Sequence, residues 1–508
     1  MNDKSSNMEP DDRYNRLLVS NVFPPGWENP QPSGRYNLVV IGAGTAGLVS
    51  AAGAAGLGAK VALIERHLLG GDCLNYGCVP SKSLIRSSRA ARDVRLAGDF
   101  GVRVPDGVEV DFPAVMERMR RLRSKISFHD SAMRFKEMEI DLFLGAARFT
   151  GKNSVDIAGK TLQFSRAVIA TGARAVEPSI DGIQQAGYLT NETVFSLTER
   201  PERLAVIGGG PIGSELAQAF HRLGCRVTII QRGAQLLGRE DSDAVQVLHD
   251  AFRAEGIELL LKAVPLEVSV TDRGKEILVE KDGRRERLAV DQILIGVGRA
   301  PNVEGLNLEA AGVKYDLKKG VSVNDLLQTT NPRIYAAGDI CLQHKFTHTA
   351  DATARIAIQN ALFLGRRKLS ALTVPWTTFT DPEIAHVGMY ERDARERGIE
   401  VDTFVRHLRE VDRAIVDGEE EGFVKVHVKR GADTILGATI VARHAGEMVS
   451  EISLAMTAGL GLKAIANVIH PYPTQAEAIK QVADMYNRTR LTPFVKKVFS
   501  SWLHLCRL

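Results

Sequence analysis

The sequence has little of several features that define whole classes of protein. Five cysteines in 508 residues are too few for a disulfide scaffold, and their odd number suits a reducing compartment. Lysine and arginine barely exceed aspartate and glutamate, 65 against 61, so no basic field directed at nucleic acid is expected. The N-terminus lacks the basic start and apolar run of a secretory signal. We therefore expect a cytoplasmic protein that binds no nucleic acid.

An uninterrupted membrane-spanning run is also missing. The longest apolar stretch, residues 38–64, contains many glycines and is broken by Lys60. Apolar residues make up 44% of the chain and charged residues 25%, close to the average of soluble globular proteins. A chain of 508 residues exceeds what one hydrophobic core supports, so several domains are expected, and their function must come from local motifs.

The first motif is a dinucleotide-binding unit. Residues 36–65, YNLVVIGAGTAGLVSAAGAAGLGAKVALIE, predict a strand, a glycine turn, a helix of small residues and a second strand. Gly42, Gly44 and Gly47 form G-x-G-x-x-G, which lets the backbone turn tightly and approach a pyrophosphate at the helix N-terminus. Glu65 ends the second strand, where a carboxylate can bind the ribose of FAD.

The same unit occurs a second time. Residues 203–231 contain Gly208, Gly210 and Gly213, each 166 residues after its counterpart, and the same offset carries Glu65 onto Gln231. A single G-x-G-x-x-G is also found where a turn merely packs a helix on a strand. Two complete units in register make that explanation improbable, so the chain is expected to bind two dinucleotides.

A cysteine pair follows the first unit. In GGDCLNYGCVPSK, residues 70–82, Cys73 and Cys78 precede a predicted helix, and a thiolate at a helix N-terminus is stabilised and reactive. Spacing alone also allows two unconnected buried cysteines or half of a metal site.

Six motifs together carry a family resemblance: GAGTAG, GGDCLNYGCVPSK, ATG at 170–172, GGGPIG, GVGRAPN at 296–302 and YAAGD at 335–339. In this order they resemble the FAD-dependent pyridine nucleotide-disulfide oxidoreductases, which include dihydrolipoamide dehydrogenase, glutathione reductase and mercuric reductase. The resemblance implies an α/β fold with two Rossmann-type domains, for FAD and NAD(P), and a C-terminal α+β domain that forms a homodimer with shared active sites.

The resemblance also implies domain boundaries and further FAD ligands. The expected segments are a flexible tail (1–35), a first FAD segment (36–185), an NAD(P)H domain (186–300), a second FAD segment (301–370), an interface domain (371–490) and an amphipathic tail (491–508). The FAD site is expected to include Thr171 and Gly172 of ATG and Gly338 and Asp339 of YAAGD.

Catalytic roles carry over by position in the motifs. Cys73 matches the interchange thiol that meets the substrate, and Cys78 matches the thiol beside the flavin. Lys82 matches the lysine near the reactive flavin nitrogen, and Glu215 matches its glutamate partner. The resemblance thus implies transfer of electrons from NAD(P)H through FAD to the cysteine pair.

The second dinucleotide site favours NADPH. NAD-specific relatives have a glutamate where this chain has Gln231, and Arg232 matches an arginine that binds the 2'-phosphate in glutathione reductase. Arg239 resembles a second such arginine after a one-residue insertion. The alternative is that both arginines are solvated surface charges and that Gln231 binds the ribose of NAD.

The C-terminal motif departs from relatives that reduce disulfides. They carry H-x-H-P-T-x-x-E, whose second histidine is the acid-base, whereas this chain has HPYPTQAE, with Tyr472 at that position and Glu477 at the orienting carboxylate. A phenol with a pKa near 10 is a poor proton shuttle at neutral pH. His470 matches the first histidine of the motif, so a structural role is expected for it, although it could replace the missing one.

Tyrosine at this position is typical of mercuric reductases. Cys73 and Cys78 would then transiently bind a soft metal ion as substrate, with small molecules as alternative acceptors. Mercuric reductases end in a vicinal cysteine pair, but this chain has only Cys506, either an incidental residue or a lone shuttle. The alternatives are a disulfide reductase like dihydrolipoamide dehydrogenase or glutathione reductase, and a flavin redox sensor or membrane-associated protein. The last is suggested by the apolar spacing of Phe494, Val498 and Trp502 beside lysines.

Overall fold

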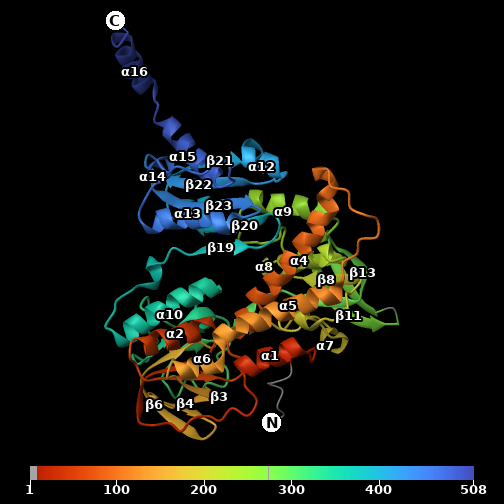
Figure 1. The fold of residues 1–508 in the computed structure, drawn as a ribbon, viewed down its shortest axis with the longest axis vertical. Coiled ribbons are helices and arrows are strands. Elements are labelled where there is room, and N and C mark those ends of the chain that lie inside the picture. The colour runs from red at the N-terminus through yellow and green to blue at the C-terminus, as the bar shows by residue number, and fades with distance from the viewer. Residues whose placement is uncertain (1–7, 273, 508) are drawn as a thin grey trace. The chain divides into compact units, whose positions relative to one another are not determined.

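The computed structural model describes residues 8–272 and 274–507 and divides them into two compact units (Figure 1). Of these residues, one unit contains those up to Ala234 together with Ile257–Ala371, and the other contains Gln235–Gly256 and those from Leu372 onward. The expected fold class, two Rossmann-type domains followed by a C-terminal α+β domain, is confirmed. The segment Gln235–Gly256, expected within the nucleotide domain, is grouped with the C-terminal unit.

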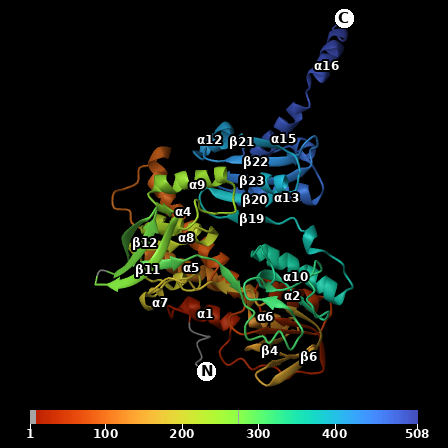
Figure 2. The same cartoon turned by 180° about the vertical axis from the view of Figure 1, so that it is seen from behind.

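The first unit contains a seven-stranded sheet in which β2 and the C-terminal ends of β1 and β6 are buried. The order is β3-β2-β1-β6-β5-β4, and β18 pairs with β6. β1, β2, β3, β6 and β18 run parallel, whereas β4 and β5 are added antiparallel. The strands are β1 (Arg35–Ile41), β2 (Val61–Glu65), β3 (Asp141–Leu144), β4 (Ala147–Gly151), β5 (Ser154–Ile157), β6 (Lys160–Ile169) and β18 (Ile334–Ala336). Helices α2 (Thr45–Gly56) and α10 (Thr347–Leu362) lie side by side against this sheet (Figures 1 and 2).

A second parallel sheet repeats the arrangement with four strands. Its order is β10-β9-β8-β14, which puts the glycine turn of the second dinucleotide unit between a central strand and α8 (Pro211–Arg222). The strands are β8 (Arg203–Ile207), β9 (Arg226–Gln231), β10 (Glu258–Leu261) and β14 (Gln292–Ile295). A three-stranded antiparallel sheet follows, made of β11 (Ala263–Thr271), β12 (Gly274–Lys281) and β13 (Arg284–Val290).

Further helices complete this unit, and two of them carry the cysteine pair. They are α1 (Arg13–Val22), α3 (Gly71–Asn75), α4 (Cys78–Leu96), α5 (Phe112–Ile126), α6 (Ala132–Glu137) and α7 (Ile183–Ala186). Short strand pairs are formed by β7 (Ala173–Ala175) with β15 (Arg299–Pro301), and by β16 (Tyr315–Asp316) with β17 (Gly320–Val321).

Residues 1–35 were expected to form a flexible tail, and residues 1–7 of this segment lie outside the described residues. For the described part the expectation is wrong. Asp12 caps α1 by accepting hydrogen bonds from two backbone amides, and its carboxylate also lies 2.5 Å from the guanidinium of Arg120. Leu18 and Val22 are fully buried. Beyond the helix, Trp27 donates to a backbone carbonyl of β3. The proline-rich composition that suggested flexibility excludes a helix there but permits this packing.

The second unit is an antiparallel sheet covered by helices. Its strand order is β19-β20-β23-β22-β21. The strands are β19 (Pro375–Thr378), β20 (Glu383–Gly388), β21 (Val401–His407), β22 (Phe423–Lys429) and β23 (Ile435–Ala442). Its helices are α9 (Ser242–Glu255), α11 (Glu391–Glu396), α12 (Asp412–Asp417), α13 (Ala445–Thr457), α14 (Leu462–Ala466), α15 (Glu477–Thr489) and α16 (Pro493–Leu505). The tail predicted over residues 491–508 contains α16, and Leu508 lies outside the described residues.

Candidate functional site

The first glycine turn is shaped as a phosphate site requires. Gly42 has φ +101°, which favours glycine, and a Cβ at Gly47 would overlap the carbonyl oxygen of Gly42. Gly44 is the N-cap of α2 and supplies no side-chain cap, so the first amides of the helix are left to a ligand. Glu65 is buried at the end of β2, where its carboxylate accepts from the Ala43 amide at 2.6 Å, and burial raises its pKa.

The second turn repeats these features. Gly208 has φ +106°, a Cβ at Gly213 would overlap the Gly208 carbonyl oxygen, and Gly210 caps α8 without a side-chain hydrogen bond. Gln231 accepts a hydrogen bond from the Gly209 amide at 3.0 Å. This repeats the bond from the Ala43 amide to Glu65, since both partners are shifted by 166 positions. Both turns therefore fit a dinucleotide pyrophosphate, and the side chain ending each second strand holds its turn in place.

The cysteine pair lies at the junction of α3 and α4. Cys73 is half-buried in α3, and Cys78 is exposed as the first residue of α4, where the helix dipole favours a thiolate. Both are free thiols in this structure. Among the described residues no group of three or more histidine, cysteine and acidic side chains is arranged to hold a metal ion.

The pKa values of the two thiols are shifted in opposite directions. The hydrogen bond with Cys73 is the largest influence that lowers the pKa of Cys78, to about 6, and the Thr347 hydroxyl at 3.3 Å and the charge of Lys82 act in the same direction. The pKa of Cys73 is raised by its hydrogen bond to Cys78 and by burial. The reduced pair therefore holds one thiolate, at Cys78, and one thiol, at Cys73.

Lys82 and Glu215, predicted as a pair, are brought together. The ammonium of Lys82, one turn into α4, lies 2.8 Å from the carboxylate of Glu215 in α8. Glu215 is almost fully buried, so this ion pair is shielded from solvent on the carboxylate side. The ion pair thus holds the side chain of Lys82, which lies on the same helix as Cys78.

The remaining predicted FAD residues lie on loops that are held by Asn302 and Arg299. No role was predicted for either residue. Thr171 donates to the carbonyl of Asn302 at 2.9 Å, and the side chain of Asn302 donates back at 2.9 Å. Gly172 has φ +68° and its carbonyl accepts from the Asn302 amide at 3.0 Å. Asn302 is the last residue of the motif GVGRAPN, which carries part of the family resemblance. The sequence did not indicate its hydrogen bonds to the ATG motif.

Asp339 occupies a short 3-10 turn, Gly338–Ile340, whose first residue has φ +77°. Burial raises the pKa of Asp339. Arg299 lies 3.9 Å from the Asp339 carboxylate and 3.0 Å from the carboxylate of Asp72, which precedes Cys73. Arg299 thus links the predicted flavin aspartate to the cysteine loop, a role that no local pattern signals.

Arg123 also contacts the cysteine loop. This residue of α5 is 1% exposed and donates to the carbonyl of Asn75, between the two cysteines, and to the side chain of Asn15 in α1, both at 2.7 Å. Burial is the main cause that lowers the pKa of Arg123, to about 10. The N-terminal helix is therefore part of the support of the redox loop.

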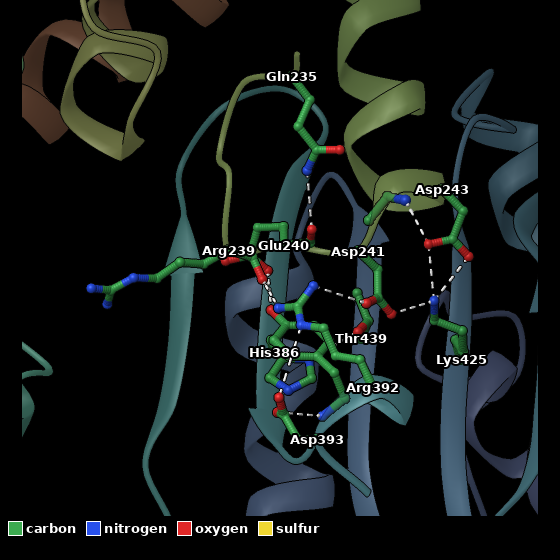
Figure 3. Close-up of polar contacts among 12 residues, drawn as sticks. Gln235, Arg239, Glu240, Asp241, Asp243, His386, Arg392, Asp393, Lys425 and Thr439 are labelled. Carbon is green, nitrogen blue, oxygen red and sulfur yellow. Dashed lines mark hydrogen bonds and ion pairs between the residues drawn. The ribbon is translucent and has the colours of Figure 1, made fainter. Parts of the chain in front are cut away.

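The predicted nucleotide arginines fall in different units. Arg232 directly follows β9 and is exposed, whereas Arg239 belongs to the segment that packs with the C-terminal unit. Figure 3 shows the side chain of Arg239 pointing away from its neighbour Glu240, which is 6% exposed. Glu240 accepts from Trp376 at 2.8 Å and from Tyr390 at 2.5 Å, and burial raises its pKa. The backbone next to Arg239 is thereby anchored to the C-terminal unit.

Ion pairs extend this anchor (Figure 3). The buried ammonium of Lys425, on β22, lies 2.7 Å from Asp241 and 2.9 Å from Asp243 at the start of α9. Three charged groups gathered in this way keep the buried lysine paired.

Tyr472 and Glu477, both in the C-terminal unit, lie near the start of α15. Tyr472 is 70% exposed and donates to Asp412 at 2.9 Å, which is the main cause that raises its pKa. His470 pairs instead with Glu451, at 2.9 Å, with its side chain buried. This fits the structural role expected for His470.

Comparison with known proteins agrees with this arrangement. Residues 36–355 match the family model "Pyridine nucleotide-disulphide oxidoreductase", and residues 374–483 match the dimerisation domain of that family, which supports a homodimer. A mercuric reductase from Staphylococcus aureus is 36% identical over 475 residues, covering 92% of this chain and 87% of that protein. A dihydrolipoyl dehydrogenase from Bacillus subtilis is 32% identical, covering 88% of this chain and 97% of that protein.

Solved structures point the same way. The HOCl-induced flavoprotein disulfide reductase RclA from Escherichia coli superposes with a TM-score of 0.79 at 28% identity, covering 88% of this chain and 99% of that one. LpdA from Mycobacterium tuberculosis gives 0.80 at 27% identity, covering 89% and 99%. Since the family model spans more than half of the chain and relatives above 30% identity span most of it, this chain belongs to the pyridine nucleotide-disulphide oxidoreductases, whose members use FAD and NAD(P)H.

Proposed function

We propose that this oxidoreductase takes electrons from NADPH and delivers them to a soft metal ion held by Cys73 and Cys78, with Hg(II) as the representative substrate. The balanced reaction is NADPH plus Hg(II) giving NADP⁺, a proton and Hg(0). Two sulfur ligands favour soft ions over hard ones.

The observation that carries the proposal is the state of Tyr472. Its phenol has a raised pKa and donates to Asp412, so at neutral pH it holds its proton and cannot act as an acid-base comparable to histidine. Reduction of a disulfide releases a thiolate that must be protonated, whereas a metal ion keeps both thiols deprotonated. A site without the histidine is therefore suited to a thiolate-bound ion.

The named relatives support the same acceptor class. Mercuric reductases from Staphylococcus aureus and Lysinibacillus sphaericus are 36% and 37% identical to this chain. One solved relative, RclA at 29% identity, is described as a Cu(II) complex.

The chain's own residues fit the cofactors. The N-terminus of α2, Glu65 and Asp339 would hold FAD, and the N-terminus of α8 with Arg232 would hold NADPH. Bound flavin would supply a carrier that accepts hydride from NADPH and passes the electron pair first to the disulfide of Cys73 and Cys78 and then to the ion held by the reduced pair. Lys82, neutralised in part by Glu215, supplies positive charge beside Cys78.

The nucleotide preference is tested with Arg232→Ala. An arginine that binds a 2'-phosphate is worth about 1.5–3 kcal/mol, so kcat/KM for NADPH should fall by about 10- to 100-fold while that for NADH is retained. Arg226→Ala, an exposed change at the start of the same strand, should alter neither. A higher kcat/KM of the native protein with NADH would contradict the preference for NADPH.

The acceptor is tested by comparing oxidation of saturating NADPH by Hg(II) in excess small thiol, by lipoamide and by oxidised glutathione. We expect the Hg(II) rate to exceed both others, and Tyr472→His to raise the two disulfide rates. Slow turnover is expected when Hg(II) arrives with strongly competing ligands, because the vicinal cysteine pair is missing.

The second candidate is a disulfide reductase, favoured by dihydrolipoyl dehydrogenases at 32% to 34% identity. Lipoamide turnover far above Hg(II) turnover in the native protein would select it.

Shared active sites are tested by complementation. We infer that each site combines Cys73 and Cys78 of one subunit with Tyr472 and Glu477 of the other. Mixed dimers of inactive Cys73→Ser chains and impaired Tyr472→Phe chains should then regain part of the activity, since one site in each is intact. No recovery, with heterodimers demonstrated by mass, would refute shared sites.

A further inference from the structure

The last described helix, α16, begins at local sequence signals and is not packed against the C-terminal unit to which it belongs. α16 begins with Thr492 as N-cap, whose hydroxyl accepts from the Val495 amide at 3.3 Å, and with Pro493 in its first turn. None of its thirteen residues is buried. In Figures 1 and 2 the helix extends away from α15 and the five-stranded sheet.

The side chains of α16 divide into two faces. At 100° per residue, the apolar side chains occupy about half of the helix circumference, and lysines, serines and His504 lie on the other half. The large members of the apolar face are Phe494, Val498, Phe499, Trp502, Leu503 and Leu505, each between 49% and 75% exposed. Such a face costs free energy in water and requires a cover.

The charge around this face has one sign. Residues 485–508 contain five lysines and arginines and no aspartate or glutamate, whereas the rest of the chain has 60 basic and 61 acidic residues. Lys496 and Lys497 lie on the polar face, where they would remain in water while the apolar face is covered. The cover that fits is apolar below and anionic at its surface.

We propose that α16 docks on an anionic lipid surface and holds the enzyme at a membrane. Thirteen residues span about 20 Å, less than the hydrocarbon thickness of about 30 Å, so the helix lies in the interface and does not cross it. Consistently, no helix within the described ranges is long and apolar enough to span a bilayer.

A second copy of the same helix is a poorer cover. Coiled-coil pairing uses a narrow seam sustained over three or more heptads, whereas α16 has fewer than two heptads and an apolar face half a circumference wide. Pairing two copies would also bring their lysines together without acidic partners.

The test is flotation of the full FAD-loaded protein with vesicles of neutral phosphatidylcholine, with and without about one third phosphatidylglycerol. We expect at least tenfold more bound protein on the anionic vesicles, and loss of this excess at high salt. Deletion of residues 491–508, Trp502→Ser, and the double change Lys496→Glu with Lys497→Glu should each lower binding by about tenfold. Ser500→Ala, on the polar face, should bind within about twofold of the native protein.

Flavin content and NADPH oxidation report folding in every variant, and none of the changed residues belongs to the redox site. Trp502 emission should shift to shorter wavelength on anionic vesicles, and Trp502→Phe should abolish the shift. Equal flotation of the deleted and full chains, or equal binding to neutral and anionic vesicles, would overturn the proposal. So would a fall in oligomer size on deletion with no vesicle binding by the native protein, since a second copy would then be the cover.

Discussion

Replacement of Thr347 by valine should raise the pKa of Cys78 by about one unit. The hydroxyl lies 3.3 Å from the sulfur, and valine keeps its shape while removing the hydrogen bond. A hydrogen bond to a charged acceptor contributes about 1.5–3 kcal/mol when buried. Because Cys78 is exposed, we expect the lower end of this range, near the 1.4 kcal/mol that corresponds to one pKa unit.

The assay is a pH titration of the reduced protein. Thiolate absorbance and the rate of alkylation at Cys78 should be half-maximal near pH 6 in the native protein and near pH 7 in Thr347→Val. The direction follows from the loss of a donor that stabilises only the deprotonated form. Cys78→Ser should abolish the signal, whereas Cys73→Ser should retain a thiolate.

The matched control is Thr349→Val, two residues further along α10. Its buried hydroxyl has no hydrogen-bond partner among the described residues, so valine should leave the pKa of Cys78 unchanged. A midpoint shift below about 0.3 units in Thr347→Val would refute the hydrogen bond as a cause and leave Cys73 and Lys82 as the stabilising groups. An equal shift in both variants would show that helix packing, not the hydroxyl, is being measured.

Three further changes test the structure. Gly47→Ala should abolish FAD binding, measured as flavin absorbance per chain, because the methyl group has no room beside the Gly42 carbonyl; Gly56→Ala, in the same helix with open space around it, should keep FAD and add about 0.5 kcal/mol of stability. Arg123→Met should lower the free energy of unfolding in urea by about 3 kcal/mol, since two buried acceptors lose their donor, whereas exposed Arg121→Met should change it little. Because the pKa of Glu240 is raised in the folded state, the folded protein binds the Glu240 proton more tightly than the unfolded chain does, and the free energy of unfolding should fall as pH rises above about 4. Glu240→Gln should remove this part of the pH dependence of Tm. Parallel curves of Tm against pH for the two proteins would show that Glu240 ionises normally.

The glycine turns were predictable because their requirement is local. A turn that must present amides to a phosphate needs positive φ and no Cβ at fixed spacings, and Gly42 and Gly208 have these properties. The residue at the end of each second strand was also visible by its offset, although its hydrogen bond to the turn was not expected.

Long-range partners were not predictable by such reasoning. Lys82 and Glu215 are 133 residues apart, and only the family resemblance placed them together. Thr347 reaches Cys78 across 269 residues, and a threonine at a helix start is ordinarily a surface residue. The N-terminal helix did have a local signal, Asp12 before a run with apolar residues at helical spacing, but the following prolines outweighed it.

The grouping of α9 with the C-terminal unit limits how this chain can be recombined with its relatives. An exchange of residues 186–300, the borders that the sequence suggests, would carry α9 away with the transplanted piece. Lys425 would then stay behind, buried without Asp241 and Asp243, and Tyr390 and Trp376 would lose Glu240. A viable chimera must therefore divide the chain twice more, at residues 234 and 256, and leave this insert with the host.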